Sequence, residues 1–167
     1  MTRRRGFTLI ELVVTLLLVS VLALVAVPLY EVTATRVKES ELRTALRQIR
    51  TALDAYKQAT DTGVVAKDAT ASGYPPSLAV LVQGVDTVAS TNPTPGQGTG
   101  PGAGRIVFLR QVPRDPFFQD QTVPPDQQWN IRAYAALPDD FSGGPDVYDV
   151  ASKSTGVGLN GIPYKDW

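Results

Sequence analysis

The feature that most constrains the fold of this chain is a long apolar run near its start. No charged residue occurs from Leu12 to Leu29, and Glu11 is the only charge between Phe7 and Tyr30. About 20 apolar residues are enough for a helix to cross the hydrocarbon core of a bilayer. A cleaved secretory signal has a shorter apolar region, of roughly 7 to 15 residues. The run therefore predicts a membrane-spanning helix over residues 7–30.

The charges of the chain are unevenly distributed. Arg3, Arg4 and Arg5 precede the apolar run, which predicts that this end stays in the cytoplasm while the rest crosses outward. The rest of the chain has 13 basic and 16 acidic residues, a net negative charge. It therefore offers no basic surface for nucleic acid. The sequence holds no Cys and no His, which excludes disulfides, thiolate nucleophiles, imidazole bases and the usual zinc sites.

Glu11 is the informative exception inside the apolar run. A carboxylate at depth in a bilayer costs at least ~2.5 to 3.5 kcal/mol by insertion scales, and less near a helix end. Two interpretations remain open. Glu11 either lies close to the lipid headgroups, or it pairs with a cation that another chain supplies.

The residues around Glu11 resemble a known signal. Arg3 to Val14 (RRRGFTLIELVV) resembles the prepilin signature of type IV pilins and type II secretion pseudopilins. The resemblance implies cleavage of a leader, residues 1–6, between Gly6 and Phe7, followed by N-methylation of Phe7. Glu11 would then be the fifth residue of the mature chain. Its expected role is assembly, through pairing with the Phe7 amine of a neighbouring subunit.

A second helical segment is expected after the apolar run. Pro28 should bend or interrupt the helix because it lacks an N–H and clashes with the preceding turn; alternatively it only ends the membrane span. Residues 31–62 then predict an amphipathic stem helix that Gly63 ends. Its apolar stripe comprises Val37, Leu42, Ala45, Leu46, Ile49, Ala52, Leu53 and Tyr56. The opposite, polar face comprises Arg36, Lys38, Glu39, Arg43, Arg47, Arg50, Asp54 and Lys57.

Residues 63–167 predict a globular domain with little regular structure. Ser77 is expected to cap a short helix through Leu78, Leu81 and Val82. Residues 89–105 are rich in Gly and Pro and predict a flexible surface loop; no Gly-Lys-Ser/Thr follows that would bind phosphate. Strands are expected within 105–110, 129–136 and 146–150. The predicted fold class is α+β, with a long N-terminal helix packed on a small antiparallel sheet, as in type IV pilin-like proteins.

The C-terminal residues raise the question of a metal. Residues 111–117 (QVPRDPF) resemble a Leu-Pro-Lys-Asp-Pro-Trp segment of major type II pseudopilins, whose C-terminal loop commonly binds calcium. Calcium needs six to eight oxygen ligands, yet residues 152–164 contain no Asp or Glu. The candidate ligands that remain are Asp146, Asp149, Asn160 and Asp166. Without calcium, the loop is expected to be anchored by burial of Leu159, Ile162, Tyr164 and Trp167.

The resemblance implies a structural protein with no catalytic residue and no cofactor apart from possible calcium. The expectation is a pseudopilin in the inner membrane whose periplasmic domain joins the pseudopilus of a type II secretion system. Implied partners are further copies, other pseudopilins, the prepilin peptidase, and the platform protein and ATPase that drive assembly. A type IV pilin for adhesion or motility is the first alternative, although such pilins commonly close a disulfide that this chain cannot form. A membrane-anchored periplasmic binding protein or enzyme, the latter using Asp115 with Asp139 and Asp140, is the other.

Overall fold

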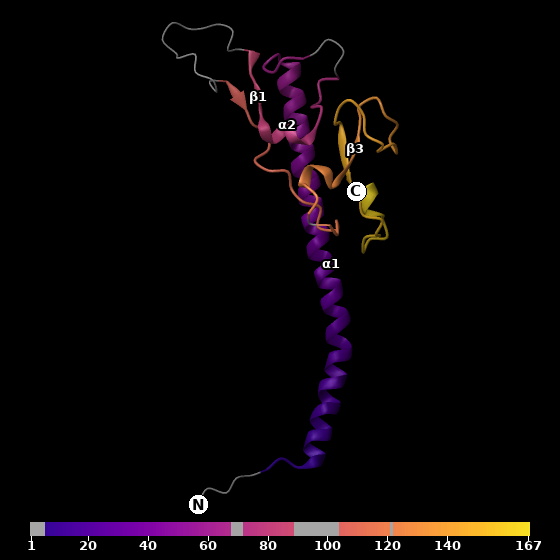
Figure 1. Cartoon of the computed structure of the whole chain (residues 1–167). Coiled ribbons are helices and arrows are strands. Elements are labelled where there is room, and N and C mark those ends of the chain that lie inside the picture. The colour runs from indigo at the N-terminus through magenta and orange to yellow at the C-terminus, as the bar shows by residue number, and fades with distance from the viewer. Residues whose placement is uncertain (1–5, 68–71, 89–103, 121) are drawn as a thin grey trace, which may run out of the picture. The chain divides into compact units, whose positions relative to one another are not determined.

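The computed structural model describes residues 6–67, 72–88, 104–120 and 122–167. The chain divides into two compact units, residues 1–38 and 39–167, which are taken in turn. Most of the expected leader (1–5) and of the expected flexible loop (89–103) lies outside the described residues. The elements, coloured along the chain in Figure 1, are α1 (Leu9–Asp61), α2 (Leu78–Gln83), β1 (Val85–Asp86), β2 (Arg105–Ile106), the 3-10 helix η2 (Pro125–Gln127), β3 (Trp129–Arg132), β4 (Asp149–Ser152) and the 3-10 helix η3 (Tyr164–Asp166).

The first unit contains the apolar part of α1. This helix is long and apolar enough to cross a membrane, as the sequence predicts. All side chains described between residues 9 and 33 are exposed, so no part of this unit buries them. The hydroxyls of Thr15 and Ser20 donate to the carbonyl oxygens of Leu12 and Leu16, at 2.9 and 2.8 Å. These polar side chains are thus satisfied within the helix, as a hydrocarbon environment requires.

Pro28 lies inside α1 and does not end it. The expectation that this proline interrupts the helix is not met, because the helix continues to Asp61. The alternative that Pro28 ends the membrane span stays a prediction, because a helix can continue beyond the membrane. One missing N–H removes a single hydrogen bond of the ladder, and the turns on either side keep theirs. A bend at Pro28 stays a prediction.

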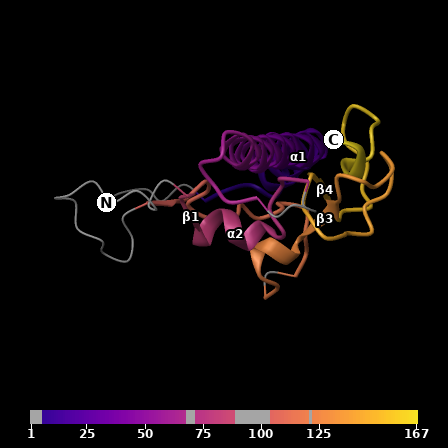
Figure 2. The same cartoon turned by 90° about the horizontal axis from the view of Figure 1, so that it is seen from above.

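In the second unit the apolar stripe of α1 forms the centre of the core. Seven of the eight predicted positions are buried: Leu42, Ala45, Leu46, Ile49, Ala52, Leu53 and Tyr56. They pack against Leu78 and Leu81 of α2, together with Trp129, Val147, Val150 and Tyr164 from the later part of the chain. Figure 2 shows these later elements gathered along one side of α1. The stem helix and its buried face are therefore confirmed.

Two positions of the predicted helix pattern are wrong. Val37 is 53% exposed, because burial along α1 begins only at residue 39. Glu39, assigned to the polar face, is 7% exposed. Residues three and seven positions apart share a helix face, so Glu39 lies on the same side as Leu42 and Leu46.

α1 ends as the sequence predicts. Gly63 adopts a φ of 75°, a conformation that side chains disfavour. The N–H groups of Val64 and Val65 both donate to the carbonyl of Ala59, at 2.9 and 3.0 Å. These bonds satisfy a carbonyl that the end of the helix would leave unpaired.

The short helix α2 forms as expected, but the expected cap does not. Ser77 stands at the N-cap position with extended backbone angles, and its side chain makes no capping hydrogen bond. Leu78 and Leu81 are buried and hold the helix against the core. Packing therefore stabilises α2, as is usual for a helix this short.

The strands form two antiparallel pairs that are shorter than predicted. β1 pairs with β2, Val85 opposite Ile106. Arg105, where the predicted loop (89–105) and the predicted strand (105–110) overlap, belongs to the strand. β3 pairs with β4, Trp129 opposite Ser152. The strand expected at 146–150 is shifted to 149–152. The main-chain N–H of Val147 instead donates to Pro75 at 2.8 Å, outside the β3–β4 ladder.

An ion-pair network ties α1 to the β3–β4 pair. Asp149 of β4 accepts from Arg50 of α1 at 2.8 Å and from Arg132 of β3 at 3.1 Å. The Asp149 side chain is 20% exposed, so much of its hydration is lost on folding. Two guanidinium groups replace that hydration.

Replacing Asp149 with Ala should destabilise the second unit. The substitution leaves Arg50 and Arg132 without their carboxylate, at an expected cost of about 1–3 kcal/mol. Unfolding of the full chain by denaturant in detergent micelles measures it. Asp86→Ala, which removes an exposed acid from β1, is the control and should change the midpoint little. Equal midpoints for the two variants would contradict the role of the network.

Candidate processing and assembly site

The predicted cleavage site lies just outside α1. Residues 6–8 have no regular secondary structure, and the helix begins at Leu9. Phe7 is 79% exposed, and a Cβ built on Gly6 would meet no atom within 4 Å. The bond between Gly6 and Phe7 is therefore accessible within the described part of the chain. Cleavage and methylation there remain predictions.

Thr8 and Glu11 form a capping box at the start of α1. The Thr8 hydroxyl accepts from the main-chain N–H of Glu11 at 3.3 Å, and the Glu11 carboxylate accepts from the N–H of Thr8 at 3.4 Å. These reciprocal bonds satisfy two N–H groups that the helix itself cannot pair. The capping role of Glu11 is additional to the role expected from its charge. The Thr-x-x-Glu spacing was the available signal for a cap.

The capping box gives Glu11 two separable chemical properties. As a hydrogen-bond acceptor it fixes where the helix begins, which keeps residues 6–8 out of the helix. As an anion exposed to its surroundings, it can also attract a cation from outside the chain. A glutamine would keep the first property and lose the second, which makes the two roles distinguishable.

A second polar contact anchors the C-terminal loop to α1. The Glu39 carboxylate accepts from the main-chain N–H of Leu159 at 2.6 Å and from the Tyr164 hydroxyl at 3.2 Å. Burial, and then the nearby Glu39 carboxylate, raise the pKa of Tyr164 above its ordinary value. Arg50 donates to the main-chain oxygen of Trp167 at 2.8 Å. One acid and one base of the helix thus hold the loop at two points.

This anchoring differs from the expected apolar one. Tyr164 is buried and stacks on Phe117 with ring centroids 4.0 Å apart, and Trp167 packs against the core, as predicted. Leu159 and Ile162 are 50% and 47% exposed, so their expected burial is wrong. The hydrogen bonds from the Leu159 N–H and the Tyr164 hydroxyl to Glu39 anchor this part of the loop instead. Glu39 was expected on the polar face of the helix, because no local pattern indicates the loop donors that bury it.

The four calcium candidates are not brought together. Asp146 accepts from the Ser72 hydroxyl and from the Tyr134 N–H, and Asp149 is held between two arginines. Asn160 accepts from the N–H of Ile162 at 3.1 Å. Asn160 and Asp166 line one groove, but three arginines line it too. Among the described residues, no group of three or more His, Cys, Asp or Glu side chains is placed to hold a metal ion.

The acids of the enzyme alternative differ in their surroundings. Asp115 is fully buried, where its carboxylate accepts from the Ser152 hydroxyl and from the N–H of Phe117. Asp139 and Asp140 are exposed, and hydrogen bonds from Ser142 lower the pKa of Asp140. Asp115 therefore has the environment of a structural acid that organises the loop around it.

Comparison with known proteins bears on the start of the chain. Residues 1–27 match the family described as "Prokaryotic N-terminal methylation motif". The chain carries a prepilin-type signal. No curated protein and no solved structure gives a significant match. The motif is consistent with a type IV pilin-like or pseudopilin protein, and together with the apolar part of α1 it indicates attachment to a membrane.

Glu39→Ala should loosen the C-terminal loop. It leaves the N–H of Leu159 and the hydroxyl of Tyr164 without their acceptor, at about 1–3 kcal/mol of unfolding free energy. Glu39→Gln keeps one acceptor oxygen and should lose less. Denaturant unfolding in micelles measures both, with the exposed neighbour Glu41→Ala as the control. An Ala variant as stable as the Glu41 control would refute the anchor.

Calcium should change the stability of the full chain little. Asp149 is already paired with arginines, and both oxygens of Asp146 accept hydrogen bonds within the protein, so a divalent cation gains few free oxygens. Thermal melting with calcium and with chelator tests this. A rise of several degrees on adding calcium would contradict it.

Proposed function

We propose that the chain is a structural pseudopilin subunit, which polymerises into the periplasmic pseudopilus of a type II secretion system. The observation that carries the proposal is the prepilin-type motif at residues 1–27, together with an apolar helix whose described side chains are all exposed between residues 9 and 33. A fully exposed apolar helix needs a membrane, or the helices of neighbouring subunits, to cover it. Both environments occur in the life of such a subunit.

Cleavage after Gly6 would complete the assembly site. The new amine of Phe7 is a cation at the head of an apolar helix, and Glu11 is the acid nearest to it along the chain. In an apolar environment an unpaired charge of either sign is costly, so an amine of one subunit pairs with the Glu11 of the next. Such pairing sets the axial register of a helical filament.

The pseudopilus is preferred to an adhesive or motile pilus. The second unit is held together by packing, an ion-pair network and Glu39, and the chain has no cysteine for the disulfide that such pilins commonly close. The proposed partners are other pseudopilins, the prepilin peptidase, the platform protein and the assembly ATPase. The subunit itself catalyses nothing and moves folded cargo by growth of the filament.

Substitutions at Glu11 separate capping from charge pairing. Glu11→Gln retains the capping-box acceptor but carries no charge, and Glu11→Ala loses both. We expect both variants to be cleaved and both to fail to assemble, because pairing with the amine needs the charge. Glu41→Gln, an exposed acid farther along α1, should assemble normally.

The readouts are gel mobility of the processed chain and the yield of sheared filaments in a bacterium that carries the secretion machinery. Filaments at the normal yield from Glu11→Gln would show that Glu11 acts only as a cap. No filaments from the unaltered chain would refute the proposed function.

A further inference from the structure

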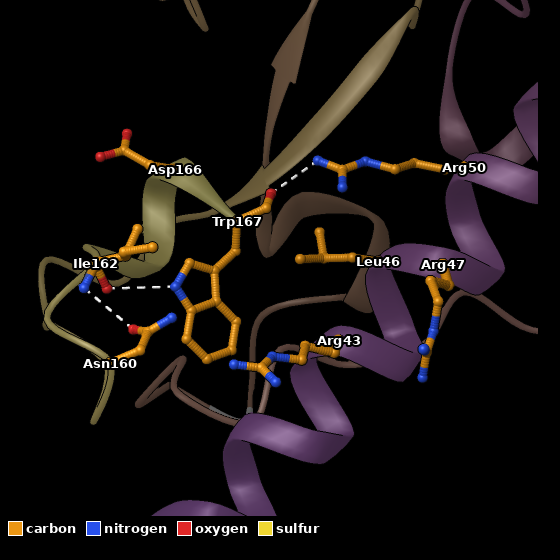
Figure 3. A pocket seen from close by; sticks show the side chains of 8 residues that line it. All are labelled: Arg43, Leu46, Arg47, Arg50, Asn160, Ile162, Asp166 and Trp167. Carbon is orange, nitrogen blue, oxygen red and sulfur yellow. Dashed lines mark hydrogen bonds between the residues drawn. The ribbon is translucent and has the colours of Figure 1, made fainter.

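A shallow groove on the second unit combines positive charge with apolar surface. Its volume is about 350 Å³, at the low end for binding sites. We name it the arginine groove; its lining, drawn in Figure 3, comprises Arg43, Leu46, Arg47, Arg50, Asn160, Ile162, Asp166 and Trp167. Arg43, Arg47 and Arg50 come from α1, and the other side comes from the C-terminal loop.

Two of the three arginines keep their charge available. Arg50 is neutralised by Asp149. Arg43 places its guanidinium 4.4 Å from the centroid of the Trp167 ring, a cation–π contact with a neutral partner that leaves its charge unneutralised. Arg47 donates only a long bond, of 3.4 Å, to Thr44. Within the described ranges no acid pairs with Arg43 or Arg47.

The groove also has an apolar part. Trp167 and the half-exposed Ile162 border it, and Leu46 lies among its lining residues. Asp166 is the one acid of the lining. The matching ligand is therefore a carboxylate carried beside an apolar side chain. Arginine edges bind carboxylates well, and the indole and aliphatic carbons favour the apolar neighbour.

This chain carries such a segment outside the lining of the groove. Residues 137–140 (LPDD) form an exposed turn, in which the N–H of Asp140 donates to the carbonyl oxygen of Leu137 at 3.0 Å. We name it the acidic turn. Leu137 is 74% exposed, and both Asp139 and Asp140 are exposed beside it. Hydrogen bonds from Ser142 lower the pKa of Asp140, so its carboxylate is charged at neutral pH.

We infer that the arginine groove of one copy receives the acidic turn of a second copy of this chain. The two surfaces are complementary in charge and in apolar character, and each is exposed on its own chain. Because the groove and the turn share no residue, the contact is head-to-tail and does not pair a surface with itself as in a symmetric dimer; it extends into an open chain when the rotation between copies does not close a ring. The inference rests on the proposed function, whose filament requires such a contact.

Cysteine cross-linking tests the contact, since the chain has no cysteine of its own. The full chain with Arg47→Cys and Asp139→Cys is produced in membranes with its secretion machinery, then oxidised or treated with a short bis-maleimide. We expect a ladder beyond the dimer on a non-reducing gel, whereas each single variant gives at most dimers. In the control, Asp86→Cys replaces Asp139→Cys, because Asp86 is an exposed acid of β1. This pair should give no ladder.

Charge reversal provides an independent measurement. Arg43→Glu with Arg47→Glu should lower the yield of filaments about tenfold or more, because acid would face acid. Asp139→Arg with Asp140→Arg should do the same. Combining all four substitutions restores opposite charges across the contact, and filaments should return. Failure of the combination to recover any yield, when each pair alone abolishes it, would overturn the inference.

The outcomes separate the contact from the proposed function. Filaments without a ladder above the Asp86 control would overturn the contact and leave the proposed function standing. A ladder without filaments would support the contact and overturn the proposed function. Neither ladder nor filaments would overturn both.

Discussion

The structure depends on a difference between two stretches of one helix. Along residues 9–33 of α1, every side chain that the structure describes is exposed, although most are Leu, Val, Ile or Ala. Each large apolar side chain that stays in water lacks the roughly 1.5–3 kcal/mol of stabilisation that full burial would contribute. Between Glu39 and Tyr56 the same helix buries its stripe in the core of the second unit. Within the described residues nothing buries the first stretch, so we expect a membrane or a bundle of like helices to cover it.

The C-terminal loop is held by Glu39, an acid of α1. A calcium ion is a cation and gathers carbonyl and carboxylate oxygens around it. Glu39 is an anion and gathers donors, the N–H of Leu159 and the hydroxyl of Tyr164. Space around this contact is tight, since a Cβ on Gly158 would lie 2.6 Å from the Trp167 ring and 3.2 Å from the Glu39 carboxylate. The group that orders the loop is therefore an anion, not a cation. This agrees with the sequence of the loop, because residues 152–164 contain no Asp or Glu that a cation would need as a ligand.

Much of this arrangement could be predicted from the sequence, because it follows from local patterns. The uncharged run, the stripe from Leu42 to Tyr56 and the stop at Gly63 each depend on residues close together in the chain. The features that could not be predicted depend on contacts between residues far apart in the chain. Glu39 is buried because a loop 120 residues away supplies its donors, and β4 begins at Asp149 because Asp146 and Val147 bond elsewhere. The capping box of Thr8 and Glu11 is a local feature, and the Thr-x-x-Glu spacing is sufficient to predict it.

The central claim is that the apolar stretch of α1 is the head of a processed subunit, freed by cleavage between Gly6 and Phe7. Intact-mass analysis of the protein extracted from membranes tests it most directly. The account predicts a chain that begins at Phe7 and carries one added methyl group on its amine. A membrane-bound protein whose mass still includes Arg3, Arg4 and Arg5 would contradict the account.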